Sequence, residues 1–373
     1  MVQFLLSGAR GRIHGTVATI ACLILLVVPV SATKVKIKKN TPPPPEVHPP
    51  DLLLEGGRKL AWEMSFSSER EVRGKPGFWG KLVNAVAGEP DHKRMVSPYS
   101  IAVDSRGRAI ITDPGAVGVH IFDFTNHKYK FIERKYKDRD PLLKPQCVAV
   151  DARDNIYVTD SQSGKVFVFD SDGKYRRAIG SIKGGEGYFK RPTGIAVDSA
   201  AHRIYVTDTL RNQIFTLDMN DGQILQKFGK TGNEQGQFNF PTEILLRDQT
   251  LAIVDAMNFR VQFFDRPGDF HNAIGKLGDS SGDMFRPKGI GVDSEGHYYI
   301  VDGFFAVVQV FDAEGRLLYY FGGRGAGAGH FQLPTGLFVD RNDRVFVVDA
   351  YNQRVQIFRY YGMGKQQGKG GQP

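Results

Sequence analysis

The chain has 373 residues, a formal net charge of +9 at pH 7 and two cysteines. Its positive charge is concentrated at the ends, because Arg10 and Arg12 contribute +2, the four lysines of residues 34–39 contribute +4, and residues 359–373 contribute +3. Residues 40–358 therefore carry no net charge, which argues against a globally basic surface of the kind that binds nucleic acid.

Residues 1–32 are predicted to be an export signal. A short basic start precedes the apolar stretch of residues 17–30, and Val30-Ser31-Ala32 is a suitable cleavage site. An uncleaved membrane anchor is the alternative, because the apolar stretch is near the lower end of the length that a bilayer span needs. Either reading places the chain outside the cytoplasm, in the periplasm or secreted, and an anchor would hold it at the inner membrane.

Cleavage of this leader would remove Cys22 and leave Cys147 as the only cysteine. No intrachain disulfide could then form. We expect Cys147, at the start of a predicted strand, to be buried and unreactive. Export also argues independently against a nucleic-acid partner.

Residues 33–58 are predicted to be a Lys/Pro-rich tether. The lysines next to the leader could contact anionic lipid headgroups, which would bring residues 15–39 close to a membrane. A solvated tether explains the same lysines equally well. The proline run of residues 42–45 favours an extended polyproline II spacer.

Two elements precede the first repeat. Residues 60–66, LAWEMSF, predict a strand that belongs to no repeat unit. The insertion of residues 74–97 predicts one short amphipathic helix, because its apolar residues recur at helical spacing. These residues are Phe78, Trp79, Leu82, Val83 and Val86. The helix either packs its apolar face on the rest of the fold or serves as a lid or docking element.

Six similar units follow, at spacings of 46 to 49 residues. They begin near residues 98, 145, 192, 241, 287 and 334. Each complete unit contains four strand patterns rich in Val, Ile, Phe and Tyr, and four strands at such a period are typical of a propeller blade. The sequence therefore predicts an all-β fold, a six-bladed β-propeller of four-stranded antiparallel blades over residues 59–361.

An aspartate ends the second strand of every unit, and the third strand begins six residues later in all six. This constant spacing predicts one shared turn geometry. The repeated aspartates could suggest metal or acid–base chemistry. The interpretation that we favour is structural, because Asp commonly accepts hydrogen bonds from the backbone of the turn that follows it.

The units resemble the NHL-repeat family. The residues that carry the resemblance are PTGIAVD at 192–198, IYVTD at 204–208, DAYNQRVQIF at 349–358 and the G-x-G-x-F-x-x-P pattern at 327–334. The similarity covers roughly Pro98 to Tyr361. It implies a six-bladed propeller that usually acts as a binding platform. It also brings in relatives with lyase or lactonase activity, which hold a divalent metal at the central channel.

The last unit lacks a fourth strand, since its third strand is followed by the glycine-rich residues 362–373, which are predicted to be disordered. An open blade edge would leave backbone groups unpaired. We therefore predict that the strand at 60–66 becomes the outer strand of the last blade and closes the ring.

The candidate binding residues lie where the units differ, at the expected mouth of the channel. They are Tyr99, Ser100, Gln146, Glu243 and Lys288. Glu243 and Lys288 belong to adjacent blades and could form an ion pair across the mouth. Such a pair would either contact a ligand or simply satisfy a polar channel.

Three further candidates lie in turns expected on the same face: Phe304, Phe305 and Tyr351. Aromatic side chains there could form a patch for a protein partner or pack against the inserted helix. No catalytic or metal-binding residue is assigned. The nine histidines are scattered, and Glu243 alone supplies too few oxygens for calcium.

The sequence thus predicts a non-enzymatic scaffold that binds a protein, peptide or glycan partner in the cell envelope and requires no cofactor. The alternative is a metal-dependent lyase or a lactonase-like hydrolase. Its site would be at the channel, where a divalent metal would act with Glu243 as ligand or base.

Overall fold

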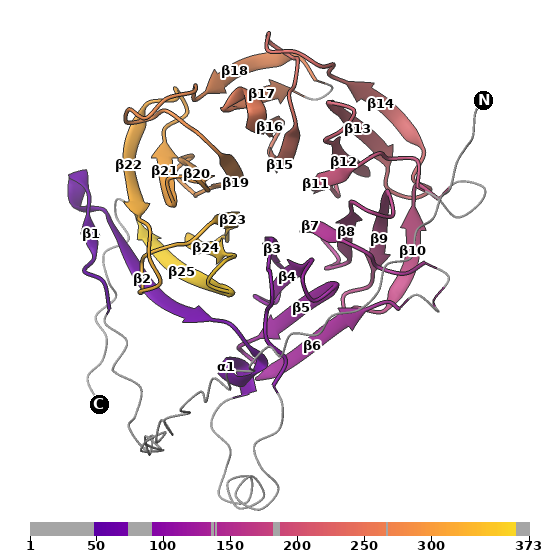
Figure 1. The fold of residues 1–373 in the computed structure, drawn as a ribbon, viewed down its shortest axis with the longest axis horizontal. Helices are drawn as coiled ribbons and strands as arrows, with labels where there is room; N and C mark the ends of the chain where they lie inside the picture. The colour runs from indigo at the N-terminus through magenta and orange to yellow at the C-terminus, as the bar shows by residue number, and fades with distance from the viewer. Residues whose placement is uncertain are drawn as a thin grey trace, which may run out of the picture. The chain divides into compact units, whose positions relative to one another are not determined.

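The computed structural model describes residues 48–73, 92–135, 138, 140–181, 187–265 and 268–362. In these residues the chain forms six antiparallel sheets arranged around a central channel as the blades of a propeller (Figure 1). The all-β, six-bladed fold is therefore confirmed. The predicted leader, residues 33–47 of the predicted tether and residues 363–373 of the predicted tail lie outside the described residues. Within the described part of the chain, no helix is long and apolar enough to cross a membrane.

The first three blades each consist of four consecutive strands. Blade 1 contains β3 (Ser100–Val103), β4 (Ala109–Asp113), β5 (Gly118–Asp123) and β6 (Lys128–Glu133). Blade 2 contains β7 (Pro145–Val150), β8 (Ile156–Asp160), β9 (Lys165–Phe169) and β10 (Tyr175–Ile179). Blade 3 contains β11 (Pro192–Asp198), β12 (Arg203–Asp208), β13 (Gln213–Asp218) and β14 (Ile224–Phe228).

The next two blades have the same order, and the last one contributes only three consecutive strands. Blade 4 contains β15 (Pro241–Arg247), β16 (Thr250–Asp255), β17 (Arg260–Asp265) and β18 (Phe270–Ile274). Blade 5 contains β19 (Pro287–Val292), β20 (Tyr298–Asp302), β21 (Val307–Phe311) and β22 (Leu317–Gly322). Blade 6 contains β23 (Pro334–Val339), β24 (Arg344–Asp349) and β25 (Arg354–Tyr361).

The ring is closed by β2 (Lys59–Phe66), which pairs antiparallel with β25 as the fourth strand of blade 6 (Figure 1). Trp62 lies opposite Phe358, and its Nε1 donates a hydrogen bond of 2.9 Å to Oε1 of Gln356. The predicted closing strand is thereby confirmed. Sequence analysis missed a fifth strand, β1 (Leu52–Leu53), which pairs with β2 although the residues were assigned to the tether.

One short α-helix, α1 (Glu69–Arg73), follows the closing strand, and its Val72 is fully buried. The helix predicted over residues 78–86 of the insertion lies outside the described residues. Two 3₁₀ helices, η1 (Glu55–Gly57) and η2 (Ala256–Asn258), complete the elements of the described chain.

The hydrophobic core lies between neighbouring blades rather than at one centre. One cluster joins Tyr299 and Val308 of blade 5 to Leu337 and Val347 of blade 6, and all four are buried. Every residue of β8 and β9 is buried as well. Strands covered on both faces explain why the sequence shows nearly continuous apolar runs instead of alternation.

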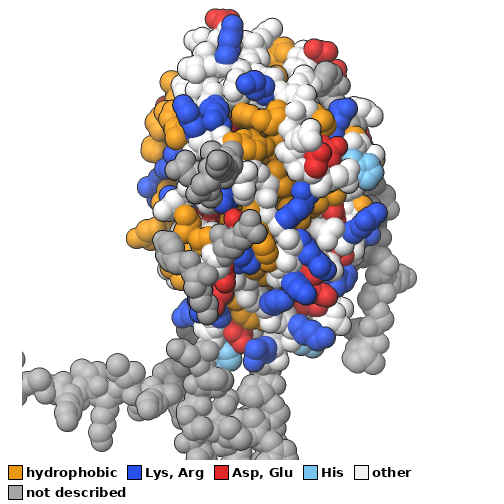
Figure 2. Space-filling model, turned by 90° about the vertical axis from the view of Figure 1, so that its right-hand side faces the viewer, with side chains coloured by type: hydrophobic (Ala, Val, Ile, Leu, Met, Phe, Trp, Pro, Cys, Tyr) orange, Lys and Arg blue, Asp and Glu red, His pale blue; other side chains and the backbone are white. Residues whose placement is uncertain are grey.

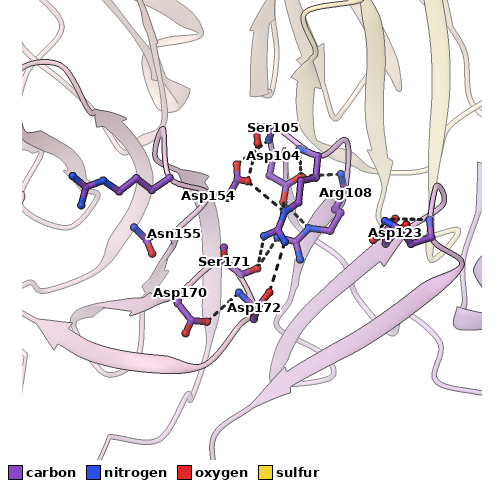
Figure 3. Close-up of polar contacts among 12 residues, drawn as sticks. Asp104, Ser105, Arg108, Asp123, Asp154, Asn155, Asp170, Ser171 and Asp172 are labelled. Carbon is purple, nitrogen blue, oxygen red and sulfur yellow. Dashed lines mark hydrogen bonds and ion pairs between the residues drawn. The ribbon is translucent and has the colours of Figure 1, made fainter.

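The aspartates that end the first strands fix turns and link neighbouring blades (Figure 3). Asp104 Oδ2 accepts a hydrogen bond of 2.6 Å from Nε of Arg108, whose Nη2 donates to the carbonyl of Ser171 in blade 2. Ser105 donates from its N–H (2.9 Å) and its hydroxyl (2.8 Å) to Asp154 of the same neighbouring blade. Both carboxylates are thus occupied by hydrogen bonds within the scaffold.

Candidate binding face

The turns between second and third strands, and the connections from each fourth strand to the next first strand, form one face, which we call the upper face. The last residue of each turn has a left-handed φ between 51° and 66°. These residues are Val117, Gly164, Asn212, Phe259, Ala306 and Gln353. The expectation of one shared turn geometry is therefore confirmed, and side chains at equivalent turn positions are presented in the same way.

Asp302, the aspartate that ends β20, shapes the aromatic part of this face. Its Oδ2 accepts hydrogen bonds from the N–H groups of Phe285 (2.7 Å) and Arg286 (3.2 Å). Its Oδ1 accepts from those of Phe304 (2.9 Å) and Phe305 (3.1 Å). One fully buried carboxylate thus ties the β18–β19 connection to the β20–β21 turn.

Glycines allow close contact of the first strands around the channel. A Cβ atom on Gly336 would lie 2.7 Å from the carbonyl oxygen of Tyr99, and one on Gly194 would lie 2.7 Å from Cα of Glu243. Real Cβ atoms do not approach backbone so closely, so these positions require glycine. The equivalent positions that do carry side chains therefore supply the chemistry of the mouth.

Two of those side chains meet, although they come from blades that are not adjacent. Cys147 on β7 is fully buried, and its Sγ lies 3.3 Å from Oε2 of Glu243 on β15, to which the thiol donates. The other oxygen, Oε1, accepts from the N–H of Ile244 at 3.2 Å. Burial raises the pKa of Glu243 to about 7, against the smaller lowering effects of these two hydrogen bonds and of Lys288. Burial, reinforced by Glu243, also raises the pKa of Cys147 well above its usual range.

The expected Glu243–Lys288 ion pair is not present in the structure, which describes both residues. Lys288 Nζ instead lies 5.9 Å from the centre of the Tyr99 ring. Burial and the neighbouring Arg286 lower the pKa of Lys288 to about 8. Glu243 hydrogen-bonds to the thiol instead, so the ion pair that the sequence made possible does not form.

A groove crosses the upper face over blades 5, 6 and 1. Its larger hollow, of about 640 Å³, is lined by Tyr99, Arg286, Lys288, Leu333 and Tyr351 among others. A second hollow, of about 320 Å³, shares Leu333 and Tyr351 with the first and continues to Phe304 and Arg324. We call the two hollows together the upper groove.

Exposed apolar side chains surround the upper groove and continue around the face. Ten of the sixteen large hydrophobic residues that are exposed in the described chain lie in these turns and connections. They are Val96, Val117, Leu210, Phe240, Met257, Leu277, Phe285, Phe304, Leu333 and Tyr351. Seen from one edge of the propeller, hydrophobic side chains gather toward the left and Lys and Arg toward the lower right (Figure 2). We call the ten residues the apolar ring.

The candidates predicted from sequence divide between two levels. Tyr99, Lys288, Phe304 and Tyr351 line the upper groove, whereas Ser100 and Glu243 line a smaller channel cavity of about 220 Å³ whose other walls are mostly apolar.

Two further candidates have mainly structural contacts. Gln146 is buried, and its backbone carbonyl accepts a hydrogen bond from the hydroxyl of Thr112. Phe305 packs edge-on against Phe304, with ring centres 5.3 Å apart.

Sequence reasoning missed three residues that matter here: Arg286, Leu333 and the role of Cys147. Arg286 and Leu333 each immediately precede a repeat proline, and the residue type at this position differs from unit to unit. Cys147 occupies the position equivalent to Glu243, but nothing in the sequence indicated that the two side chains reach each other across the channel.

The described residues do not fit a divalent metal at the channel. In residues 48–362, apart from the undescribed gaps, no group of three or more His, Cys, Asp or Glu side chains is arranged to hold a metal ion. Cys147 is the one other candidate ligand in contact with Glu243, and two ligands are too few to hold a divalent metal.

Comparison with known families agrees with the fold. Residues 104–229 match a family described as a 6-bladed beta-propeller, and residues 331–358 match the NHL repeat. Among characterised proteins, the chain is 28% identical over 120 residues to Protein brain tumor of Drosophila melanogaster. The match covers 31% of this chain and only 11% of that protein.

Solved structures show the same fold at low sequence identity. Virginiamycin B lyase from Staphylococcus aureus is 15% identical, with a TM-score of 0.52 over 81% of this chain and 99% of its own. A gluconolactonase from Xanthomonas campestris is 14% identical, with a TM-score of 0.54 over 85% and 99%. A Bacteroides thetaiotaomicron protein of unknown function is 15% identical, with a TM-score of 0.57 over 72% and 70%. The chain is a six-bladed propeller with an NHL repeat in its last blade.

Proposed function

We propose that this propeller is a non-enzymatic binding platform that docks a protein partner through the apolar ring. The observation that carries the proposal is the concentration of exposed apolar residues on one face, where ten of the sixteen in the described chain are found. Contiguous exposed apolar surface is rare on soluble proteins outside interaction sites.

The composition of the ring supports a protein interface. The rings of Phe285 and Phe304 pack against each other at a tilt of 35° with their centres 4.3 Å apart, and Tyr351 is 69% exposed. Aromatic residues are enriched among those that dominate binding energy, and rigid side chains lose little entropy when a partner binds. Asp302 holds the backbone of Phe285 and Phe304, so this part of the ring is already ordered before binding.

We further propose that the platform works outside the cytoplasm. The support is the basic start, apolar stretch and cleavage pattern of residues 1–32, followed by a lysine-rich and proline-rich segment that could keep the propeller near a membrane. Fractionation of cells expressing the full chain would test the location, and recovery from the cytoplasm would overturn it.

The binding proposal is tested by crosslinking capture from envelope extracts with the tagged full-length chain. The informative variant is Phe304→Ser with Tyr351→Ser, which removes two exposed members of the ring. The matched control is Leu225→Ser with Tyr320→Ser, on outer strands and 53% and 58% exposed. We expect a partner that is retained by the wild type and the control and lost from the ring variant. A partner captured equally by all three, or no specific partner, would overturn the proposal.

A second candidate function rests on Glu243. A carboxyl with a pKa of about 7, next to a cavity of about 220 Å³, is suited to general-base catalysis at neutral pH. The lyase and the gluconolactonase that share the fold make hydrolysis or elimination the reactions to test. Turnover of a lactone or hydroxyglycine peptide that is abolished by Glu243→Gln would favour this candidate over the platform.

A further inference from the structure

The upper groove is a cationic surface without acidic partners. Three cations line it, namely Arg286, Lys288 and Arg324, and no Asp or Glu is among its lining residues. Arg324 donates to the carbonyl of Phe304 at 3.0 Å. In the described chain, Arg286 and Lys288 have neither an ion pair nor a side-chain hydrogen bond with another residue.

This arrangement differs from that of two other turns on the same face, whose arginines are paired. Arg260 and Arg354 each contact the aspartate of their own turn, at 3.0 Å to Asp255 and 2.8 Å to Asp349. Half-burying the ammonium of Lys288 next to Arg286 costs free energy, because no carboxylate of the described chain is in ion-pair contact with it and Glu243 only partly offsets the cost. A bound anion would recover that cost and would add charge-assisted hydrogen bonds.

The groove also offers an apolar wall beside its cations. Tyr99 lies below Lys288, and Leu333 and Tyr351, which are 49% and 69% exposed, lead on to Phe304. A ligand that is only a small anion would leave this wall uncovered. The two hollows, of about 640 and 320 Å³, fall within the size range of sites that hold compact ligands or short segments.

We propose that the upper groove recognises an acidic peptide segment. A carboxylate would bind Arg286 and Lys288, and a neighbouring hydrophobic side chain would lie on Leu333, Tyr351 and Phe304. The inference rests on the proposed function, because it names the part of a partner that this face selects. A peptide is favoured over a nucleic acid because the cations are few, are interrupted by apolar residues and belong to a body, residues 40–358, with no net charge.

The test is fluorescence anisotropy with short labelled peptides and the full-length protein. The probe is a hexapeptide of alternating Phe and Glu with both ends blocked, and its counterpart carries Gln in place of Glu. A third peptide, the Gln sequence with a free C-terminal carboxylate, distinguishes a side-chain carboxylate from a chain terminus. The protein variants are Arg286→Gln and Lys288→Gln, with Lys230→Gln as control. Lys230 is exposed in the β14–β15 connection and does not line the groove.

We expect saturable binding of the Glu peptide that weakens about tenfold or more in either groove variant and stays unchanged in the control. The blocked Gln peptide should bind at least about tenfold more weakly, and added salt should weaken the Glu peptide. Preference for the third peptide would identify a C-terminal carboxylate as the recognised group, which also supports the proposal.

Equal binding of the Glu peptide and the blocked Gln peptide, no binding of any peptide, or insensitivity to both groove variants would overturn the proposal. Stronger competition by an oligothymidylate than by the Glu peptide would overturn it in favour of a phosphate ligand. Each of these results leaves the capture experiment with Phe304→Ser and Tyr351→Ser unaffected. The peptide experiment can therefore refute the anion site without refuting the binding platform. The capture experiment can likewise refute the platform without refuting the anion site.

Discussion

Sγ of Cys147 on β7 donates a hydrogen bond of 3.3 Å to Oε2 of Glu243 on β15, and the two strands belong to blades separated by a third. The glycine of the intervening blade, Gly194, makes this contact possible, because a side chain there would collide with the backbone of Glu243. Burial raises the pKa of both groups, so a thiol and a carboxyl that are neutral below about pH 7 link two parts of the channel mouth across the intervening blade.

Replacing Glu243 by Gln should change how stability depends on pH. A carboxyl whose pKa is raised on folding stabilises the protein fully below its ordinary pKa of 4.5, and this contribution is lost as pH rises through about 7. We expect Glu243→Gln to have nearly wild-type stability at pH 4 and to be more stable than wild type at pH 8, by on the order of 2 kcal/mol. Urea unfolding at both pH values measures this difference. If the difference in unfolding free energy between wild type and Glu243→Gln were the same at pH 4 and pH 8, the raised pKa of Glu243 would be contradicted.

The reactivity of Lys288 should report its surroundings. Burial and Arg286 lower the pKa of its ammonium to about 8, with Arg191 acting in the same direction and Cys147 and Glu243 opposing it. Because only the neutral amine reacts, acetylation of Lys288 should rise with a midpoint near pH 8, read by mass spectrometry. Arg286→Gln should shift that midpoint upward. An unchanged midpoint would show that Arg286 does not act on Lys288.

The closing strand should contribute strongly to stability. Phe66 on β2 is 1% exposed and packs against Phe122 and Phe124 of blade 1, with ring centres 4.9 Å apart in both pairs. Phe66→Ala should lower the free energy of unfolding by about 3–5 kcal/mol, because it leaves a cavity where the two ends of the ring meet. Leu53→Ala is the control, since Leu53 is 79% exposed on β1 and should change stability by less than about 0.5 kcal/mol. Equal losses of unfolding free energy for Phe66→Ala and Leu53→Ala in chemical denaturation would refute a closing role for β2.

Gly336 should not tolerate a side chain. The added Cβ of Gly336→Ala would lie 2.7 Å from the carbonyl oxygen of Tyr99 and 2.8 Å from Cα of Ser100, and backbone atoms cannot move aside at low cost. We expect a loss of about 1–3 kcal/mol in thermal or chemical unfolding. Gly327→Ala makes the same chemical change where the nearest atom is 3.9 Å away, so it should be nearly neutral. If Gly327→Ala destabilised the protein more than Gly336→Ala, the close contact between blades 6 and 1 at Gly336 would be contradicted.

The local pattern of the sequence was sufficient to predict the architecture of the fold. The constant distance from each strand-ending aspartate to the next strand predicted six equivalent turns, and the turn-ending residues share one φ range. The missing fourth strand of the last unit predicted the pairing of residues 60–66 with β25. The β1 strand was missed because two residues, Leu52 and Leu53, carry no periodicity that could be recognised.

The site was predictable only as a list of positions. The repeat register placed Tyr99, Glu243 and Lys288 at the channel mouth, because equivalent residues of a repeat occupy equivalent places. It could not give their partners, since side-chain contacts across a channel depend on the radius of the ring and on the rotamers. The possible Glu243–Lys288 ion pair is therefore not formed, and the contact of Glu243 with Cys147 was not foreseen.

The sequence by itself determined the number of blades, the strand order, the closing of the ring and the structural use of the repeated aspartates, because each depends on spacing along the chain. Only the tertiary structure decided which side chains meet between blades, which cations lack a counter-charge and how exposed apolar residues gather on one face. Those properties arise from distances between segments far apart in sequence, such as Tyr99 and Lys288, which no local pattern encodes.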